Sequence, residues 1–246
     1  MINYVVIIPA LNPTNSLLDY VKRLIDKGFS QIIVVNDGSD QAFLSIFSEL
    51  NKLERCTVLT HEQNKGKGRA LKTAFTHVLK YYQNFSGIIT ADADGQHAIY
   101  DVYKVAQMLQ PNPKSLILGV RDFNQAGIPK KSIFGNTCTS LIFQLLFKKK
   151  LKDTQTGLRG IPIDELPWML CLKGERYEYE MNMLIQAVKR KINIMEVNIQ
   201  TIYLNNNSGS YYNTISDSLR ILRRIISGFF RKGKQSEVYL VKNHDK

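Results

Sequence analysis

The chain has few cysteines and no long hydrophobic runs, and each shortage excludes a class of protein. Its three cysteines, Cys56, Cys138 and Cys171, lie far apart and show no metal-ligand spacing. They fit a reducing cytosol and are expected to serve as small apolar residues rather than as a disulfide framework or a zinc site. No apolar run approaches the ~20 residues that a membrane-spanning helix needs, so an integral membrane protein is excluded.

No signal peptide, linker or repeat is visible in the sequence either. The first apolar run, residues 4–8, is short and ends at Pro9, which is not typical of a signal peptide. We see no Gly/Ser linker, internal repeat or low-complexity segment, and 44% hydrophobic residues suffice for a full core. We therefore expect one domain over residues 1–230, with a basic tail at 231–246, in a protein that is soluble or peripheral.

The positive charge is concentrated in the second half of the chain. The net charge is +12. Residues 1–118 hold 12 basic and 10 acidic residues, whereas residues 119–246 hold 21 and 11. A basic half of this kind indicates nucleic acid, an anionic membrane surface or a phosphorylated ligand as partner, without choosing among them.

Strand and helix patterns alternate through the first half. Apolar, β-branched runs predict buried strands at residues 4–9, 31–35, 57–60, 87–91 and 116–120, and helical patterns at about 15–27, 40–53, 67–82 and 98–109 separate them. The second half predicts helices at about 132–147, 177–190 and 214–230 and strands at 156–161 and 193–203. This order predicts an α/β fold with a mostly parallel central sheet and helices on both faces.

Two carboxylates one residue apart follow the fourth predicted strand, in Asp92-Ala-Asp-Gly-Gln96. In such sheets ligands bind beyond the carboxyl ends of the strands. Oxygen ligands at this spacing suit Mg²⁺ or Mn²⁺, which prefer a few carboxylates together with substrate phosphates. Taken alone, the motif also fits ordinary turn chemistry.

Two further polar motifs follow predicted strands. Asp37, in Asn36-Asp-Gly-Ser39, can accept hydrogen bonds from a nucleobase; the alternative is an Asx-turn or a helix cap made by Ser39 or Asp40. Asn64-Lys-Gly-Lys-Gly68 leads into a helix and suits anion binding, although a flexible basic turn explains it equally well. It is neither a Walker loop nor a Rossmann glycine motif.

Together with Ile8-Pro-Ala-Leu-Asn12, these motifs occur in the order found in family 2 glycosyltransferases of the GT-A fold. The chain resembles the polyprenyl-phosphate glycosyltransferases of that family, which are similar to dolichol-phosphate mannose synthase, over roughly residues 4–230. The resemblance implies a Rossmann-like nucleotide-diphospho-sugar transferase fold. Residues 1–120 would bind the nucleotide-sugar, and residues 121–230 would bind the acceptor.

The resemblance also assigns roles to individual residues. Asp92, Asp94 and Gln96 would hold Mg²⁺ or Mn²⁺, and Asp94, Glu180 and Arg121 are the candidate catalytic residues. Arg121, Lys131 and Arg159 would bind the acceptor phosphate. The nucleotide-sugar would contact Pro9, Ala10, Leu11, Asn12, Val35, Asp37, Gly38, Lys65, Gly66, Lys67, Asp92 and Ala93.

Two departures from the family pattern affect these roles. Asn12 is followed by Pro13 where the family often has glutamate, so that contact is missing. Residues 206–212, which are basic in the eukaryotic synthases, carry no charge here. Neutralising the diphosphate would then depend more on the metal, on Lys65 and Lys67, and on Arg121. The departures also leave the donor nucleotide open: we choose UDP, and GDP is the alternative.

The implied reaction is inverting transfer from a nucleotide-sugar, with UDP-GlcNAc or UDP-Glc as examples, to polyprenyl (undecaprenyl) phosphate in cell-envelope glycan synthesis. The alternative acceptor is a hydroxyl of a polysaccharide or teichoic-type polymer, which would require a carboxylate base. The excess of positive charge favours the phosphate. A nucleic-acid-binding protein without catalysis is a distant alternative, because the aromatic residues are not interleaved with basic ones as a stacking platform would require.

A membrane location follows from two amphipathic segments. Residues 133–147 are apolar and precede Lys148-Lys-Lys-Leu-Lys152, and the helix at about 214–230 sets apolar against basic residues. An apolar face flanked by lysine and arginine suits an anionic membrane surface, although a core-packed helix with a solvated basic face explains it nearly as well. We expect a cytoplasmic protein attached to the inner face of the cell membrane, with a small integral membrane protein as a candidate partner.

Overall fold

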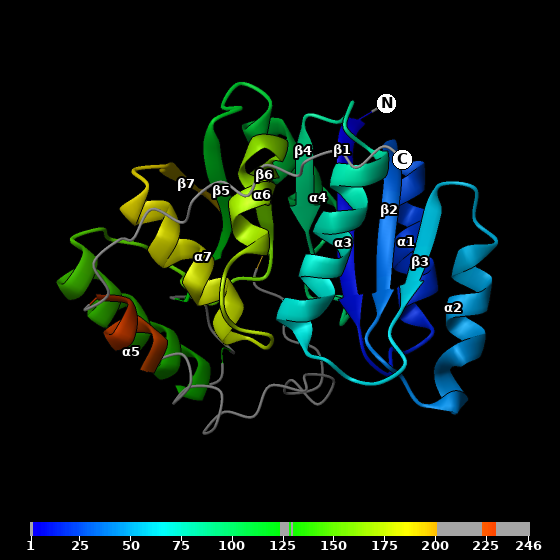
Figure 1. Ribbon diagram of the computed structural model, residues 1–246, viewed down its shortest axis with the longest axis horizontal. Coiled ribbons are helices and arrows are strands. Elements are labelled where there is room, and N and C mark those ends of the chain that lie inside the picture. Colours follow the sequence, from blue (N-terminus) through cyan, green and yellow to red (C-terminus); the bar gives the residue numbers. More distant parts are fainter. Residues whose placement is uncertain (1, 124–127, 129, 201–222, 230–246) are drawn as a thin grey trace, which may run out of the picture.

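The computed structural model describes residues 2–123, 128, 130–200 and 223–229. At its centre is a seven-stranded sheet in the order β3-β2-β1-β4-β6-β5-β7 (Figure 1). The strands are β1 (Ile2–Ala10), β2 (Phe29–Asn36), β3 (Cys56–Thr60), β4 (Gly87–Thr90), β5 (Ser115–Arg121), β6 (Arg159–Pro162) and β7 (Asn193–Ile199). The helices are α1 (Ser16–Asp26), α2 (Leu44–Asn51), α3 (Lys67–Tyr81), α4 (Ile99–Leu109), α5 (Lys130–Phe147), α6 (Leu166–Leu170) and α7 (Glu178–Lys189), with 3₁₀ turns at Gln41–Phe43 and Ile163–Glu165.

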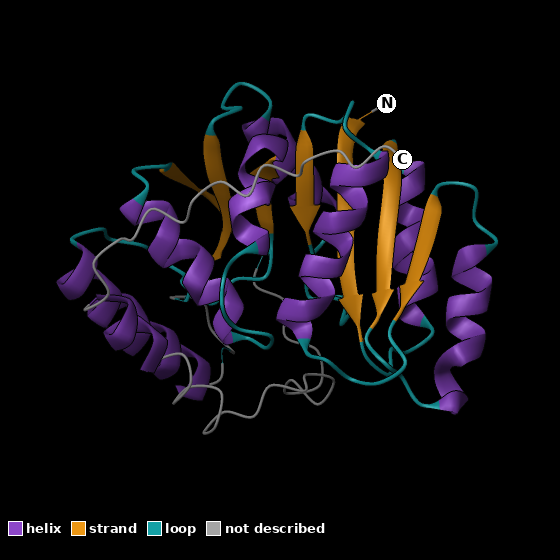
Figure 2. Ribbon diagram, in the orientation of Figure 1, coloured by secondary structure: helices purple, strands orange, loops and turns teal. Residues whose placement is uncertain are grey.

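The sheet is parallel except at β6. This strand runs antiparallel to both of its neighbours, β4 and β5, whereas the pairs β1–β2, β1–β4, β2–β3 and β5–β7 are parallel. The arrowheads of β1, β2 and β3 point to one edge, where the connecting loops gather (Figure 2). The expected mostly parallel sheet is confirmed, and its carboxyl edge lies where the polar motifs were predicted.

Helices cover both faces of the sheet, as expected. Along β1, Val5 and Ile7 face the core shared with α3, α6 and α7, whereas Val6 and Ile8 face the core shared with α1, α2 and α4. All four side chains are fully buried. A strand buried on both faces reads as a continuous apolar run, which is why this pattern identified the strand.

The predicted elements differ from the observed ones mainly in the second half. β6 begins at Arg159 rather than at 156. The helix α6 was not predicted, because the five residues Leu166–Leu170 give too short a helical pattern. Residues 223–229 are helical, in keeping with the expected C-terminal helix; the remainder of 214–230 and the end of the strand expected at 193–203 lie outside the described residues. None of the described helices is long and apolar enough to cross a membrane.

Candidate active site

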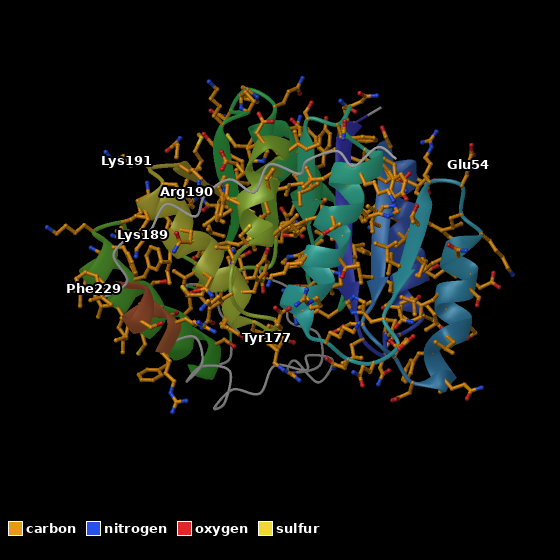
Figure 3. The ribbon with its side chains drawn as sticks, viewed as in Figure 1. Glu54, Tyr177, Lys189, Arg190, Lys191 and Phe229 are labelled. Carbon is orange, nitrogen blue, oxygen red and sulfur yellow. The ribbon has the colours of Figure 1, made fainter. Side chains whose placement is uncertain are left out.

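A pocket of about 550 Å³ opens at the carboxyl ends of β1, β2 and β4. Its walls come from the loops after these strands, the start of α3 and the residues just before α7, and Tyr177 lies at this edge (Figure 3). The lining residues are Pro9, Ala10, Leu11, Asn12, Pro13, Thr14, Asp37, Phe43, Asn64, Gly66, Lys67, Asp92, Ala93, Asp94, Arg176 and Tyr177. Most of the residues expected at the nucleotide-sugar and metal are thus brought together.

Three residues expected at the nucleotide-sugar lie outside this lining. Val35 is fully buried in the core beside α3. Gly38 has φ +74°, and a Cβ there would lie 2.2 Å from the backbone of Gln63, so glycine allows the loop after β3 to pack against it. The side chain of Lys65 is exposed, whereas its backbone N–H points inward to a carboxylate.

Asn12 ties the loop after β1 to the loop after β2. Its side-chain amide donates to Asp40 Oδ2 and its Oδ1 accepts from the Asp40 backbone N–H, both at 2.8 Å. Its own backbone N–H donates to Ser39 Oγ at 2.8 Å. Asp40 makes no side-chain capping hydrogen bond to the following 3₁₀ turn, so the capping alternative for Asp40 is wrong: this side chain binds Asn12 instead.

The carboxylate of Asp37 is buried and holds the loop after β3. It accepts hydrogen bonds from the backbone N–H groups of Lys65 at 3.0 Å and Gly66 at 2.8 Å. It also lies 2.7 Å from Nδ1 of His61. The loop that precedes α3 is therefore fixed against the end of β2, and Asp37 shapes the pocket wall through that loop.

A second cluster centres on the ammonium group of Lys67, the first residue of α3. Its Nζ lies 2.6 Å from Asp92 Oδ1 and 2.9 Å from Glu180 Oε2. Burial alone would lower the pKa of Lys67, but the charges of Asp92 and Glu180 raise it above its usual value. Lys67 therefore stays charged and joins the end of β4 to α7.

Asp92 is held on its other side as well. Its Oδ2 lies 3.2 Å from Nε2 of the buried His97. A Cβ on Gly157 would lie 2.3 Å from the same oxygen, so only glycine lets the loop before β6 pack directly against this carboxylate. Burial alone would raise the pKa of Asp92, but Lys67 and His97 hold it well below its usual range, so this carboxylate is ionised.

Asp94 lines the pocket beside Asp92 and has a different environment. Its Oδ1 accepts the backbone N–H of Gln96 at 3.0 Å, which closes the tight turn. Burial and the neighbouring charge of Asp92 raise the pKa of Asp94 above its usual value. Two carboxylates that repel each other in this way favour a shared cation.

A divalent metal ion fits these donors. Among the residues that the structure describes, no cluster of three or more His, Cys, Asp or Glu side chains could form a complete metal cage. The pocket instead offers the carboxylates of Asp92 and Asp94. Mg²⁺ and Mn²⁺ commonly bind one or two carboxylates and take their other ligands from phosphates and water, so the donor set suits an ion that arrives with a diphosphate.

The basic residues expected at the acceptor phosphate have separate environments. Arg121, at the end of β5, forms a bidentate ion pair with the fully buried Asp153, at 2.7 and 3.1 Å. Arg159 is completely buried: Nε donates to the carbonyl of Thr156 at 3.0 Å and Nη1 to the carbonyl of Glu180 at 2.7 Å. The backbone of Lys131 lies in α5, and its side chain is outside the described part of the chain.

Arg159 is therefore placed differently from the sequence expectation. Burial lowers the pKa of its guanidinium, although the nearby carboxylates of Glu180 and Asp153 oppose this shift. The side chain links the backbone at Thr156 to that at Glu180 and has no exposed surface with which to contact an acceptor. A basic residue on a short strand gave no sign of this burial, because the strand's neighbours are set by the tertiary fold.

Several residues at the site were not singled out from the sequence. His61 follows β3 and contacts Asp37, and His97 follows Gln96 directly and contacts Asp92. Their positions after strands were a usable signal, since the other polar motifs share it. Arg176 and Tyr177, to which no individual role was assigned, line the pocket from before α7.

The strand order, the single antiparallel strand and the acidic pocket at the carboxyl edge define a GT-A fold. The model of "Glycosyl transferase family 2" matches residues 5–164, and the chain belongs to this family of glycosyltransferases.

Relatives of known name support the same assignment. The UDP-N-acetylglucosamine–dolichyl-phosphate N-acetylglucosaminyltransferase of Methanococcus voltae is 35% identical over 217 residues, which cover 80% of this chain and 84% of that protein. The dolichyl-phosphate beta-glucosyltransferase of Saccharomyces cerevisiae is 29% identical over 225 residues, covering 79% of this chain and 65% of that protein.

The fold is also that of a solved enzyme. The glucosyl-3-phosphoglycerate synthase of Mycobacterium tuberculosis, crystallised with Mn²⁺, UDP and phosphoglyceric acid, superposes with a TM-score of 0.65 over 94% of this chain and 80% of that one. The two sequences are 16% identical, so the likeness concerns the fold.

Proposed function

We propose that this glycosyltransferase moves a sugar, with inversion, from a UDP-sugar to a polyprenyl phosphate, and that it uses Mg²⁺ or Mn²⁺. The observation that carries the proposal is the pair Asp92 and Asp94 at the wall of the pocket formed by the ends of β1, β2 and β4. The names of the two relatives support a polyprenyl-phosphate acceptor, and the Methanococcus relative supports UDP-GlcNAc as donor. Residues 1–120 would bind the donor and residues 121–230 the acceptor.

The divalent ion, when bound, would stabilise the negative charge that develops on the departing diphosphate. Asp92 and Asp94 would hold it, and the turn closed by Gln96 would keep Asp94 facing the pocket. The N-terminus of α3, beginning at Lys67 beside Gly66, would contribute positive potential next to the diphosphate. Alignment of acceptor and donor would supply much of the remaining rate.

A phosphate acceptor is consistent with the state of Glu180. A hydroxyl acceptor requires a carboxylate to remove its proton, whereas a lipid phosphate is already an anion. Glu180 is buried and bonded to Lys67, which leaves it poorly placed as that base. Arg121 and Lys131 would then bind the acceptor phosphate, with Asp153 fixing the plane of the Arg121 guanidinium.

The acceptor would reach the enzyme along an apolar surface on α5. Phe134, Leu141 and Leu145 share one face of this helix and are 71%, 55% and 69% exposed. Residues 223–229 lie beside α5, where Phe229 contacts Phe147 with ring centroids 6.2 Å apart (Figures 1 and 3). Lys148 and Lys150 follow the same helix and are exposed. An apolar face bordered by lysine fits the inner, anionic face of the cell membrane.

The chemical test is a transfer assay with radiolabelled UDP-GlcNAc or UDP-Glc, undecaprenyl or dolichyl phosphate, and Mn²⁺. We expect label in the organic phase as an acid-labile product. Label found only in an aqueous polymer would instead support the hydroxyl acceptor. A thermal-shift screen of UDP- and GDP-sugars with Mn²⁺ decides the nucleotide, since a ligand of the folded state raises the melting temperature.

The acceptor and membrane roles have their own tests. Lys131→Ala should raise the KM for polyprenyl phosphate more than the Kd for UDP; equal effects on both would contradict the phosphate contact. Leu141→Ser with Leu145→Ser should reduce sedimentation with vesicles rich in anionic lipid, whereas the matched pair Leu44→Ser and Tyr100→Ser, exposed elsewhere, should not. Undiminished binding by the first pair would exclude α5 as the membrane contact.

A further inference from the structure

Both carboxylate oxygens of Asp92 already have partners within the protein. Oδ1 lies 2.6 Å from the ammonium group of Lys67, and Oδ2 lies 3.2 Å from Nε2 of His97. A metal ion that binds Asp92 therefore competes with Lys67 for Oδ1. Because both competitors are cations at one oxygen, the presence of either weakens the binding of the other.

Lys67 also has a second carboxylate within reach. Its Nζ is 2.9 Å from Glu180 Oε2, and the Lys67 side chain is only 16% exposed, so it is confined between the two acids. The other oxygen of Glu180, Oε1, is buried and has no hydrogen-bond partner among the residues that the structure describes. Glu180 can thus accept a further hydrogen bond from Lys67 when Lys67 leaves Asp92.

We propose that Lys67 is a tethered counter-ion of Asp92 that makes metal binding depend on the nucleotide. The inference rests on the proposed function, because it assumes that Asp92 and Asp94 hold a divalent ion beside a diphosphate. Lys67 bonds to Asp92 until a donor binds. It then turns toward Glu180 and the diphosphate, and Asp92 Oδ1 becomes accessible to the ion.

The charges at the pocket account for this order. Asp92, Asp94 and Glu180 supply three carboxylates around one ammonium, and a divalent ion added alone at Asp92 Oδ1 would lie next to the ammonium group of Lys67 and be repelled by it. A nucleoside diphosphate brings negative charge that balances both cations, and it lies within reach of the start of α3. Metal and nucleotide should therefore each strengthen the binding of the other, by about tenfold or more.

A purely structural ion pair is the competing explanation for these contacts. In that case Lys67 would only join α3 to β4 and α7, and its loss would lower stability without altering how metal and nucleotide depend on each other. The two explanations differ in the affinity for metal alone, which can be measured without acceptor, sugar transfer or turnover.

The experiment is a titration of the full-length protein with Mn²⁺, in which free Mn²⁺ is measured by electron paramagnetic resonance, with and without UDP. In Lys67→Met, Mn²⁺ alone should bind about tenfold more tightly than in the wild type, and adding UDP should increase the affinity for Mn²⁺ only slightly. In Glu180→Gln, Lys67 keeps only Asp92, so Mn²⁺ alone should bind about fivefold more weakly. Lys80→Met removes a charge from an exposed position of the same helix and should match the wild type.

The outcomes separate this inference from the proposed function. If UDP strengthens Mn²⁺ binding in the wild type but Lys67→Met keeps the wild-type affinities with and without UDP, the counter-ion role is overturned. If the wild type binds no Mn²⁺ even with UDP, the metal site itself fails. Circular-dichroism melting checks that each variant is folded. If Lys67→Met is unfolded, Lys67→Arg, which keeps the charge, should still show Mn²⁺ binding that depends on UDP.

Discussion

Two buried carboxylates, those of Asp37 after β2 and Asp153 beside the end of β5, are held by different partners. On the proposed donor side, Asp37 is fixed by two backbone N–H groups and a histidine. On the proposed acceptor side, Asp153 forms a bidentate ion pair with the guanidinium of Arg121. A carboxylate bound by backbone amides sets the path of a loop, whereas one bound by arginine fixes the orientation of a charged side chain. Asp37 is thus held mainly through backbone groups, and Asp153 mainly through a side chain.

The largest effect is expected for Arg159→Met, which removes the buried guanidinium at the start of β6. The carbonyls of Thr156 and Glu180 would lose their donors, and the free energy of unfolding should fall by about 3 kcal/mol. Urea denaturation measures it. The control Arg23→Met, at an exposed position of α1, should change stability little. A loss as small as that of the control would mean that the buried arginine does not organise this part of the fold.

Asp94→Asn tests the donor side at the proposed metal. It keeps the shape of the side chain but removes one of two carboxylates, so kcat for transfer should fall by about 100-fold or more with the fold intact. Steady-state kinetics with Mn²⁺ or Mg²⁺ and a circular-dichroism spectrum measure both properties. Near-normal turnover in this variant would remove the metal assignment.

Asp37→Asn should sharpen the contrast between backbone and side-chain organisation. One of its two oxygens becomes an N–H donor that faces the N–H group of either Lys65 or Gly66, so the loop before α3 should loosen. We expect the Kd for UDP to rise by about tenfold, in line with the ~1.5 kcal/mol of a hydrogen bond to a charged group. Calorimetry with UDP checks it, and an unchanged Kd would show that the loop is held by other contacts.

Lys65→Ala is the smallest change and serves as a matched comparison for Asp37→Asn. The side chain of Lys65 is exposed, while its backbone N–H, which alanine retains, makes the contact with Asp37. The Kd for UDP should rise no more than about threefold, as for an exposed charge. A rise as large as that of Asp37→Asn would show that the Lys65 side chain itself binds the nucleotide.

Much of the pocket at the ends of β1, β2 and β4 could be predicted, because it depends on residues that are close together in the sequence. β1, β2 and β4 are continuous apolar runs, and polar residues follow each of them at the edge where parallel strands bring their loops together. The spacing of Asp92 and Asp94 within a single tight turn predicted that both would face the pocket. The contacts of Asn12 with Asp40 escaped prediction, because the mutual position of two loops depends on how the strands pair.

By itself, the sequence determined the alternation of strands and helices, the edge of the sheet that carries the site, and the acidic pair at the end of β4, since each depends on neighbouring residues. Only the tertiary structure decided that Lys67 lies between Asp92 and Glu180 and that Arg159 is buried. These contacts join segments far apart in the chain. Their geometry arises from packing α3 and α7 on one face of the sheet, which no local pattern of residues encodes.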